Sequence, residues 1–305
     1  MYAGIEAGGT KFICAVGTGP DDLRDVTAFP TTTPDETLTR TSEFVAAHAP
    51  DLRAIGVASF GPVDLSYNSD SYGYITSTPK PLWGYTDVLG PLRHSTDVPI
   101  GFDTDVNGAA LGEARWGAAA DVDSCVYVTV GTGIGGGAMI GGQLVHGLLH
   151  PEMGHLPVRR HPDDDYAGGC PFHGDCLEGL AAGPAIAARW GTPGQELTGA
   201  PLRAAAKIEA EYLAQLAVAA TLLLSPARLI FGGGVMHLDG LVDALRSRTV
   251  ELLNAYLDVP EITEHTDRYI VRPKLGDHAG VLGAIALAAD AAENPTTLRP
   301  QRGSG

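Results

Sequence analysis

The chain has 305 residues, of which 44% are hydrophobic, and this length favours two domains over one. Its 36 acidic residues outnumber its 20 basic residues, so the formal net charge is −16 at pH 7. That charge disfavours binding to nucleic acid or to an anionic membrane. No apolar run reaches the roughly 18–20 residues that span a bilayer, and no secretory signal is visible. With four cysteines that make no disulfide framework, these features predict a reduced, cytoplasmic protein without nucleic-acid or membrane partners.

Predicted strands and helices alternate along the chain. In chain order the predictions are strands at 2–5 and 12–16, a helix at 35–48, a strand at 55–59, loops and turns over 64–91, a strand at 98–102, a helix at 107–116, strands at 125–130 and 138–140, helices at 177–190 and 201–224, a strand at 228–231, and helices at 238–257 and 279–292. Thr33 is the expected N-cap of the first helix, and Pro34 lies in its first turn. The polar chain beyond Glu293 is expected to fray. The alternation predicts an α/β fold with layered sheets.

A strand, a glycine turn and a second strand occur twice, more than a hundred residues apart. The first turn contains Gly8, Gly9, Thr10 and Lys11, and the second spans residues 131–137. Glycines let the backbone approach a phosphate, where bare N–H groups, a hydroxyl and an ammonium can hold the anion. Neither turn matches a P-loop, and the second does not open a helix as a dinucleotide fingerprint does. The repeat predicts a duplicated unit with two phosphate-binding hairpins.

Asp105 follows a predicted strand and precedes a predicted helix, and Asp103 and Asn107 lie close to it in the sequence. Strand ends that face a crevice are where α/β proteins place ligands. A carboxylate there can accept the proton of an attacking hydroxyl during phosphoryl transfer. The alternative is helix capping, in which Asp105 or Asn107 satisfies backbone N–H groups. The spacing alone favours neither interpretation.

The run from His150 to Cys176 is the most specific pattern in the chain. Cys-x2-His-x2-Cys with a histidine upstream offers four ligands for a tetrahedral zinc site that is closed by protein groups and therefore structural. The predicted ligands are His155, Cys170, His173 and Cys176. His150 and His161 are alternatives for the upstream ligand. The acidic run 163–165 is expected to be a solvated loop.

Together these motifs resemble those of the ROK sugar kinases, and most closely their bacterial fructokinase branch. The likeness extends over nearly the whole chain and rests on residues 4–11, 103–107, 131–135, 150–155 and 170–178. It implies an α/β fold of two actin-like (ribonuclease H-like) domains with a cleft between them. The expected domains are residues 1–112 and 113–284, and the second carries the zinc loop. A final helix at about 285–298 is expected to pack back onto the first domain.

The resemblance also implies roles for particular residues. Those expected to bind ATP are Gly8, Gly9, Thr10, Lys11, Thr132, Gly133, Gly232, Gly233 and Gly234. Those expected to bind the sugar are Asp105, Glu152, His155 and Glu178. Asp105 is also the expected catalytic base. Because His155 would bind both zinc and sugar, a structural zinc would hold in place the sugar wall, meaning the side chains of Glu152, His155 and Glu178 that contact the sugar.

The implied reaction transfers a phosphoryl group from ATP, bound with magnesium, to the 6-hydroxyl of D-fructose, which gives fructose 6-phosphate. The implied partners are ATP and a hexose, with fructose favoured, and a second copy of the chain in a homodimer. Glu6 and Thr104 stand where many family members have Asp and Asn. Many members also have Cys-x-Cys-x4-Cys in the zinc run. The fructokinase branch shares these departures, so they support that branch.

Other functions stay open at this point. A ROK hexokinase acting on glucose, mannose or another hexose would differ in wall residues that are matched only by analogy. A catalytically inactive sugar-binding protein is less consistent with Asp105 and two phosphate turns. A sugar-responsive repressor would need a DNA-binding domain before the first turn, and the start of that turn at Gly8 leaves no room for one. The loop over 64–91 is equally consistent with a lid over the sugar and with ordinary turns.

Overall fold

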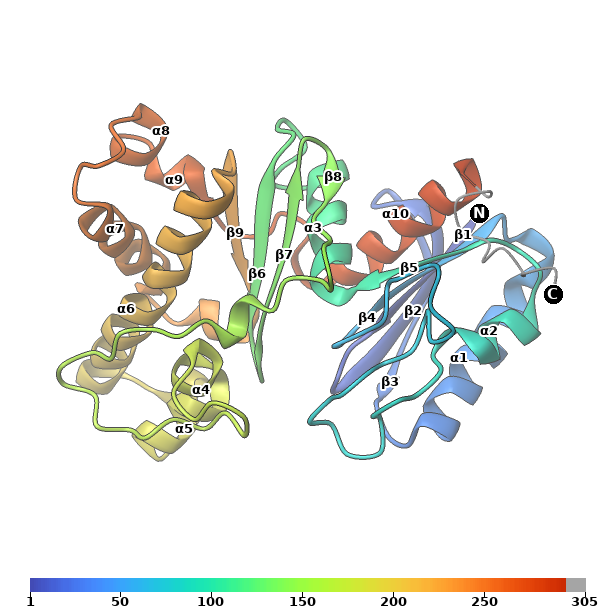
Figure 1. The fold of residues 1–305 in the computed structure, drawn as a ribbon, viewed down its shortest axis with the longest axis horizontal. Helices are drawn as coiled ribbons and strands as arrows, with labels where there is room; N and C mark the ends of the chain where they lie inside the picture. The colour runs from blue at the N-terminus through green and yellow to red at the C-terminus, as the bar shows by residue number, and fades with distance from the viewer. Residues whose placement is uncertain (295–305) are drawn as a thin grey trace. The chain divides into compact units, whose positions relative to one another are not determined.

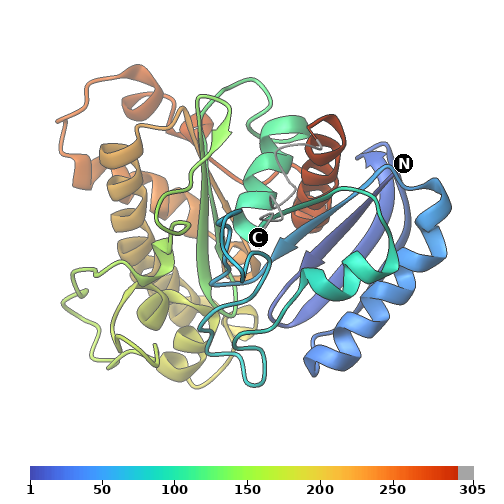
Figure 2. The same ribbon diagram turned by 45° about the vertical axis from the view of Figure 1, so that its right-hand side comes forward.

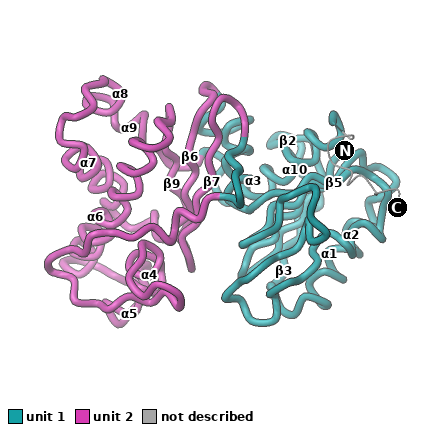
Figure 3. Tube along the Cα trace, in the orientation of Figure 1, with its two compact units in different colours: residues 1–120, 144–150, 274–305 teal, residues 121–143, 151–273 magenta. Residues whose placement is uncertain are grey.

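The computed structural model describes residues 1–294 (Figures 1 and 2). This part of the chain forms two compact units, coloured separately in Figure 3. Within the described residues, unit 1 contains 1–120, 144–150 and 274–294, and unit 2 contains 121–143 and 151–273. Residue 112, the expected end of the first domain, lies inside a helix, and unit 1 continues to Ala120.

Unit 1 is built on a mixed sheet of five strands in the order β3-β2-β1-β4-β5. The strands are β1 (Tyr2–Ala7), β2 (Lys11–Gly19), β3 (Asp22–Pro30), β4 (Ala54–Ser59) and β5 (Ile100–Thr104). β2 pairs antiparallel with both β1 and β3, whereas β1, β4 and β5 run parallel. β3 was not predicted. It is an edge strand whose side chains are mostly exposed, so it has no apolar alternation to read.

The helices of unit 1 are α1 (Pro34–His48), α2 (Leu89–Ser95), α3 (Asp105–Trp116) and α10 (Ala279–Glu293). Thr33 caps α1 as predicted, because its side chain accepts the N–H of Glu36. The seven-residue α2 was not predicted and begins inside the expected loop. α10 begins at Ala279, well before residue 285. Residues 295–298 of the expected final helix, and the tail expected to fray, lie outside the described residues.

A row of glycines lets α10 lie directly on the sheet of unit 1. Gly4, Gly56 and Gly101 are partners in register on β1, β4 and β5. A Cβ on Gly4 would lie 2.7 Å from the carbonyl oxygen of Val281 in α10, and the other two glycines also face the backbone of this helix. The row therefore explains how a helix that is distant in sequence completes the unit.

The loop over 64–91 is anchored in the core of unit 1 by Trp83. This side chain is fully buried and packs against Phe12 and Phe60, with ring centroids 5.7 and 5.4 Å away. Its indole N–H donates to the carbonyl oxygen of Thr32 at 2.8 Å. This part of the loop is therefore an element of the core.

Unit 2 repeats the same strand plan in the order β10-β9-β6-β7-β8. Its strands are β6 (Cys125–Val130), β7 (Ile134–Ile140), β8 (Gln143–Leu144), β9 (Arg228–Gly232) and β10 (Ile270–Val271). β6 pairs antiparallel with β7 and parallel with β9, as β1 does with β2 and β4. The predicted duplication is thus confirmed. β7 begins at Ile134 and not at 138, so most of the predicted seven-residue turn is strand.

The helices of unit 2 are α4 (Leu177–Ala181), α5 (Gly183–Trp190), α6 (Gly199–Leu224), α7 (Leu241–Leu253), α8 (Pro260–Thr263) and α9 (Thr266–Tyr269). The single helix predicted at 177–190 is wrong, because the chain is extended at Ala182 and a new helix begins at Gly183, with Pro184 in its first turn. α7 is shorter than predicted and ends at Leu253, because the next residue, Asn254, adopts a left-handed conformation with φ 48°. α6 and α7 pack side by side (Figure 1). No helix in the described part of the chain is long and apolar enough to cross a bilayer.

Both units also contain short 3-10 helices. They span Ala49–Asp51, Met153–His155, Gly194–Glu196, Gly234–His237 and Gly276–His278. The second of them carries a predicted metal ligand, and the fourth begins at a predicted nucleotide residue. These two segments therefore place candidate site residues outside the regular helices and strands.

Candidate active site and metal centre

The first glycine turn joins β1 to β2 and is held by backbone hydrogen bonds. The N–H of Gly8 donates to the carbonyl oxygen of Lys11 at 3.1 Å, and the hydroxyl of Thr31 donates to the carbonyl oxygen of Gly8 at 2.7 Å. A Cβ on Gly8 would lie 2.7 Å from the same Lys11 oxygen, so the turn requires glycine there. Thr10 and Lys11 are exposed. Gly9, Thr10 and Lys11 thus form a fixed turn that ends in the ammonium group of Lys11, and such a turn can bind an anion.

Glu6 is a carboxyl group near the end of β1, beside this turn. Burial raises its pKa, and the charge of Lys11 partly offsets that effect. Its Oε2 is buried and has no hydrogen-bond partner among the described residues. Carboxylate oxygens are the ligands that hydrated magnesium prefers. An orphaned carboxyl oxygen next to a phosphate-sized turn is therefore suited to a hydrated cation.

Asp105 is the first residue of α3 and is half-buried. The N-cap of this helix is Thr104, whose Oγ1 accepts the N–H of Asn107 at 3.1 Å. The N-cap position therefore belongs to Thr104 and not to Asp105 or Asn107. Asp105 Oδ1 accepts the N–H of Val106 at 2.9 Å. Its carboxylate lies at the N-terminal end of the helix, where the helix dipole favours negative charge.

A polar cluster that the sequence analysis missed adjoins Asp105. The buried carboxylate of Asp103 accepts the side-chain N–H of Asn107 at 2.8 Å and contacts His146 Nε2 at 2.8 Å. The hydrogen bond with Asp103 raises the pKa of His146. Asp103 could be noticed from the sequence because it lies close to Asp105. His146 lies 43 positions after Asp103, and nothing in the sequence indicated that the two side chains meet.

The second glycine turn joins β6 to β7 and contacts α4. The N–H of Gly131 donates to the carbonyl oxygen of Gly133 at 2.8 Å. Directly after the turn, the N–H of Ile134 donates to Oε2 of Glu178 at 2.9 Å. The structure therefore brings a predicted phosphate turn and a predicted sugar residue together.

A cavity of about 620 Å³ lies in unit 2 beside this turn. Thr132 and Gly234 line it, so two of the predicted nucleotide residues share one wall. Its apolar side chains include Ile186, Leu197, Leu202 and Leu238. Gly232 and Gly233 do not line it, and a Cβ on Gly232 would lie 2.7 Å from Pro273. The polar side chains of Gln195, His237 and Asp239 also line it, and a cavity of this mixed lining with bare backbone on one side suits a base and its phosphates.

The four predicted metal ligands come together in unit 2. The ligand atoms of His155, Cys170, His173 and Cys176 all lie within 4.8 Å of one another. His155 Nδ1 is 3.7 Å from the Sγ atom of Cys170 and 3.6 Å from that of Cys176. Tetrahedral zinc with bonds of about 2.0–2.3 Å places its ligand atoms about 3.3–3.8 Å apart. All four cysteines of the chain are free of disulfides, so both thiols can ligate.

The two alternative histidines are engaged elsewhere. His150 Nε2 accepts the N–H of Val63 at 3.0 Å. His161 Nδ1 accepts the N–H of Asp163 at 3.1 Å. Neither histidine belongs to the cluster of ligand atoms. The geometry therefore selects His155 as the upstream ligand.

Glu152 directly precedes the 3-10 helix Met153–His155 and lies three residues before His155. Desolvation by surrounding groups and the nearby charge of Glu178 raise the pKa of Glu152 to about 7. Two carboxyl groups and one histidine ring thus lie in the same part of unit 2. Such a group of acceptors suits the hydroxyl groups of a sugar.

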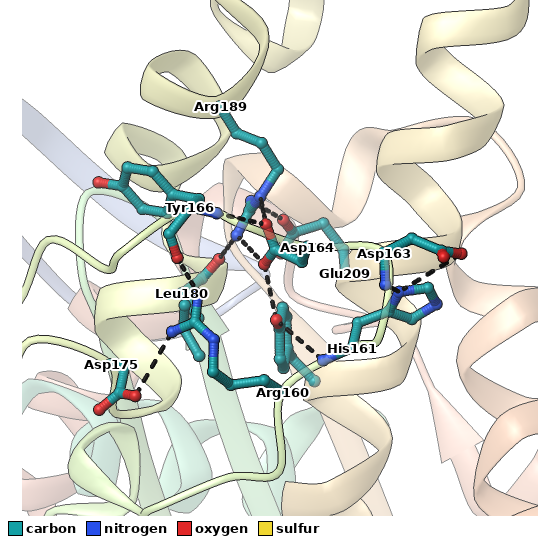
Figure 4. A network of polar contacts seen from close by, with 10 residues as sticks. Arg160, His161, Asp163, Asp164, Tyr166, Asp175, Leu180, Arg189 and Glu209 are labelled. Atoms are coloured by element: carbon teal, nitrogen blue, oxygen red, sulfur yellow. Dashed lines mark hydrogen bonds and ion pairs between the residues drawn. The ribbon is translucent and has the colours of Figure 1, made fainter.

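One expectation about this loop is wrong. Asp163 and Asp165 are exposed, as expected for a solvated run, but the side chain of Asp164 is 1% exposed. Its carboxylate accepts a hydrogen bond from Arg189 at 2.9 Å (Figure 4). It also accepts the hydroxyl of Tyr212 at 2.6 Å. Both partners are distant in sequence, so the acidic run alone could not reveal the pairing.

Comparison with known proteins shows the family and the fold of this chain. The profile of the ROK family matches residues 2–291. A fructokinase of Zymomonas mobilis is 48% identical over 300 residues, which cover 96% of this chain and 98% of that protein. A fructokinase of Streptococcus mutans is 44% identical over 292 residues, covering 94% and 97%. The solved ROK hexokinase of Thermus thermophilus is 28% identical with a TM-score of 0.76, over 96% of this chain and 99% of that one. The expected actin-like α/β fold is confirmed.

Proposed function

This chain belongs to the ROK family, and we propose that it is an ATP-dependent fructokinase that phosphorylates the 6-hydroxyl of D-fructose. The observation that carries the proposal is the likeness to fructokinases over nearly the whole length of both chains. The two phosphate-sized turns, the carboxylate at the start of α3 and the Cys/His cluster all fit this activity.

Asp105 is the proposed catalytic base. Thr104 caps α3, so the Asp105 carboxylate is not needed for that role. Asp105 accepts the proton of the 6-hydroxyl late in the reaction, as the loose transition state collapses toward product. Magnesium bound with ATP supplies charge neutralisation at the phosphates. The orphaned oxygen of Glu6 and the ammonium of Lys11 are the groups that would hold this assembly at the first turn.

The cavity of unit 2 is the proposed nucleotide site. Its apolar wall would hold the adenine, and the bare backbone at Thr132 and Gly234 would lie along the ribose and phosphates. Gly232 and Gly233 support this wall from behind by allowing close packing of the chain. In this proposal the turn at Gly131–Gly133 contacts phosphate through its N–H groups.

The metal centre is proposed to hold structural zinc. Four protein ligands close a tetrahedral site and leave no position for a reactant. His155 presents Nδ1 to the two sulfur atoms, which leaves its Nε2 for a sugar hydroxyl. Together with Glu152 and Glu178, His155 then forms the sugar wall, and the metal fixes the orientation of one of its members.

A coupled assay of ADP release across a panel of hexoses tests the proposal. We expect fructose to give the highest kcat/KM. Glucose or mannose far above fructose would support the alternative of a broader ROK hexokinase, and no turnover with any hexose would refute the kinase. A homodimer is part of the same proposal, and light scattering coupled to size-exclusion chromatography would measure it.

A further inference from the structure

A buried ionic cluster in unit 2 joins the metal-bearing loop to three helices (Figure 4). Arg189 of α5 is its centre, and its side chain is 7% exposed. Asp164 of the loop and Glu209 of α6 are the acidic partners, with side chains 1% and 0% exposed. Buried charges are costly unless they are paired, so a cluster this deep is an organised feature of the fold.

The planar guanidinium group of Arg189 donates hydrogen bonds to both the loop and α4. Nε and Nη2 donate to the two carboxylate oxygens of Asp164, each at 2.9 Å. Nη2 also donates to the carbonyl oxygen of Leu180 at 2.7 Å, and Nη1 donates to Glu209 at 3.3 Å. This pattern of donors is available to arginine and not to lysine, whose ammonium is a point charge.

The other partners of Asp164 fix the loop in place. Its carboxylate accepts the hydroxyl of Tyr212 at 2.6 Å and the backbone N–H of Tyr166 at 3.1 Å. The guanidinium of Arg189 also lies over the Tyr166 ring, 5.1 Å from its centroid. Burial favours the neutral form of Asp164, but the hydrogen bonds from Arg189 and Tyr212 outweigh it and lower the pKa. Asp164 and Arg189 therefore form the charged pair that holds this part of the loop.

The contact with Leu180 matters because α4 is only five residues long. A helix of this length has no stability of its own and depends on groups at its ends. At its start stands Cys176, one of the four metal ligands. At its end, Arg189 satisfies one of the carbonyl groups that the helix leaves unpaired, and the cation suits the negative end of the helix dipole. Glu178 lies between these two attachments.

We infer that Arg189 is a positioning residue for the sugar wall, because it holds α4 and Glu178 in place from the end that the metal does not reach. This inference rests on the proposed function, in which Glu178 contacts the sugar. It gives the wall an attachment through the Arg189–Asp164 pair in addition to the metal ligand Cys176 and the hydrogen bond from Ile134 to Glu178. Loss of the Arg189–Asp164 attachment loosens Glu178 without removing any ligand or any group that contacts substrate.

The test compares Arg189→Lys with Arg248→Lys. Arg248 is a control for the forked contact alone, because it binds Glu211 on α6 through Nε at 2.6 Å and Nη2 at 3.2 Å while its side chain is 36% exposed. We expect Arg189→Lys to raise the KM for fructose about fivefold or more, to raise the KM for ATP by a smaller factor because Glu178 also contacts the second glycine turn, and to leave kcat within about twofold of wild type. Arg248→Lys should leave all three values within about twofold.

Two measurements without turnover complete the test. In Arg189→Lys we expect faster amide hydrogen exchange in the peptide covering 177–181. We also expect faster release of zinc to a chromogenic chelator from protein that starts with one zinc per chain. If that variant does not fold, Asp164→Asn replaces it with the same expectations, since it keeps the shape and removes the charge of the partner.

The inference is overturned if the folded variant keeps a wild-type KM for fructose, or if hydrogen exchange at 177–181 is unchanged. It is also overturned if both KM values and kcat change together, which would indicate a general structural defect. If the wild-type enzyme does not phosphorylate fructose, the proposed function fails. The exchange and zinc-release measurements then decide alone whether Arg189 holds α4.

Discussion

The backbone N–H of Ile134 donates a 2.9 Å hydrogen bond to Oε2 of Glu178. Ile134 directly follows the second glycine turn, and Glu178 belongs to α4 of the proposed sugar wall. A Cβ on Gly133 would lie 2.6 Å from the same carboxylate oxygen, so glycine is needed for this approach. One carboxylate therefore connects the phosphate turn with the sugar-binding side chains.

Replacement of Glu178 tests this connection. Glu178→Ala should raise the KM for both fructose and ATP, because the hydrogen bond to the turn and the sugar contact are lost together. Glu178→Gln keeps an oxygen that can accept the Ile134 N–H. We expect it to raise the KM for fructose about tenfold with much less effect on ATP. Steady-state kinetics with each substrate varied measures both, and equal effects of the two variants on ATP would contradict the connection.

Asp105→Asn should lower kcat by about 10²–10⁴-fold, because the amide cannot accept the proton of the sugar hydroxyl. Binding of fructose should change little, since the shape of the side chain is kept. Asp35→Asn is the control, because Asp35 is an exposed acidic residue in the first turn of α1, a helix with the same kind of threonine cap. Calorimetric sugar titration and single-turnover rates would separate binding from chemistry. A variant at position 105 with near-wild-type kcat would exclude it as the base.

Metal removal should weaken both the fold of unit 2 and sugar binding. We expect one zinc per chain in the purified protein and a melting temperature lowered by at least about 4 °C after verified chelation. The KM for fructose should rise more than that for ATP, because His155 is shared between metal and sugar. His173→Ala should reproduce these effects, whereas His265→Ala, at an exposed position outside the cluster, should not. Elemental analysis and thermal unfolding provide the check, and unchanged stability without metal would rule out a structural role.

Glu209→Gln should change how stability depends on pH. Burial raises the pKa of Glu209 well above its ordinary 4.5, although Arg189 partly offsets the effect. Below pH 4.5 the folded and unfolded chains both carry the proton, so its favourable contribution is complete. Above that pH the unfolded chain releases the proton while the folded chain retains it, so stability falls until the raised pKa is reached.

The glutamine variant mimics the protonated acid and cannot lose that contribution. Its free energy of unfolding relative to wild type should therefore increase above pH 4.5, by up to about 1.4 kcal/mol per pH unit. Urea unfolding of both proteins between about pH 5 and pH 8 measures this difference, and other titrating groups cancel because they are common to both. Parallel pH profiles would show that Glu209 is ionised in the folded protein.

Local patterns in the sequence determined much of this protein. The two strand–turn–strand hairpins, the Thr33 cap and the metal ligands at Cys170, His173 and Cys176 each depend on residues close together in the chain. Their physical basis is local, since turn geometry, capping and ligand spacing are set within a few residues. The family likeness extended these patterns to the fold and to the substrate class.

The tertiary structure alone decided the features that join distant residues. The pairing of Asp103 with His146 and that of Asp164 with Arg189 span 43 and 25 positions, and neither has a sequence period. The cap at Thr104 became distinguishable from its neighbour Asp105 only through backbone geometry. Because burial and ion pairing are properties of the packed chain, an acidic run such as 163–165 looks solvated until its partner lies beside it.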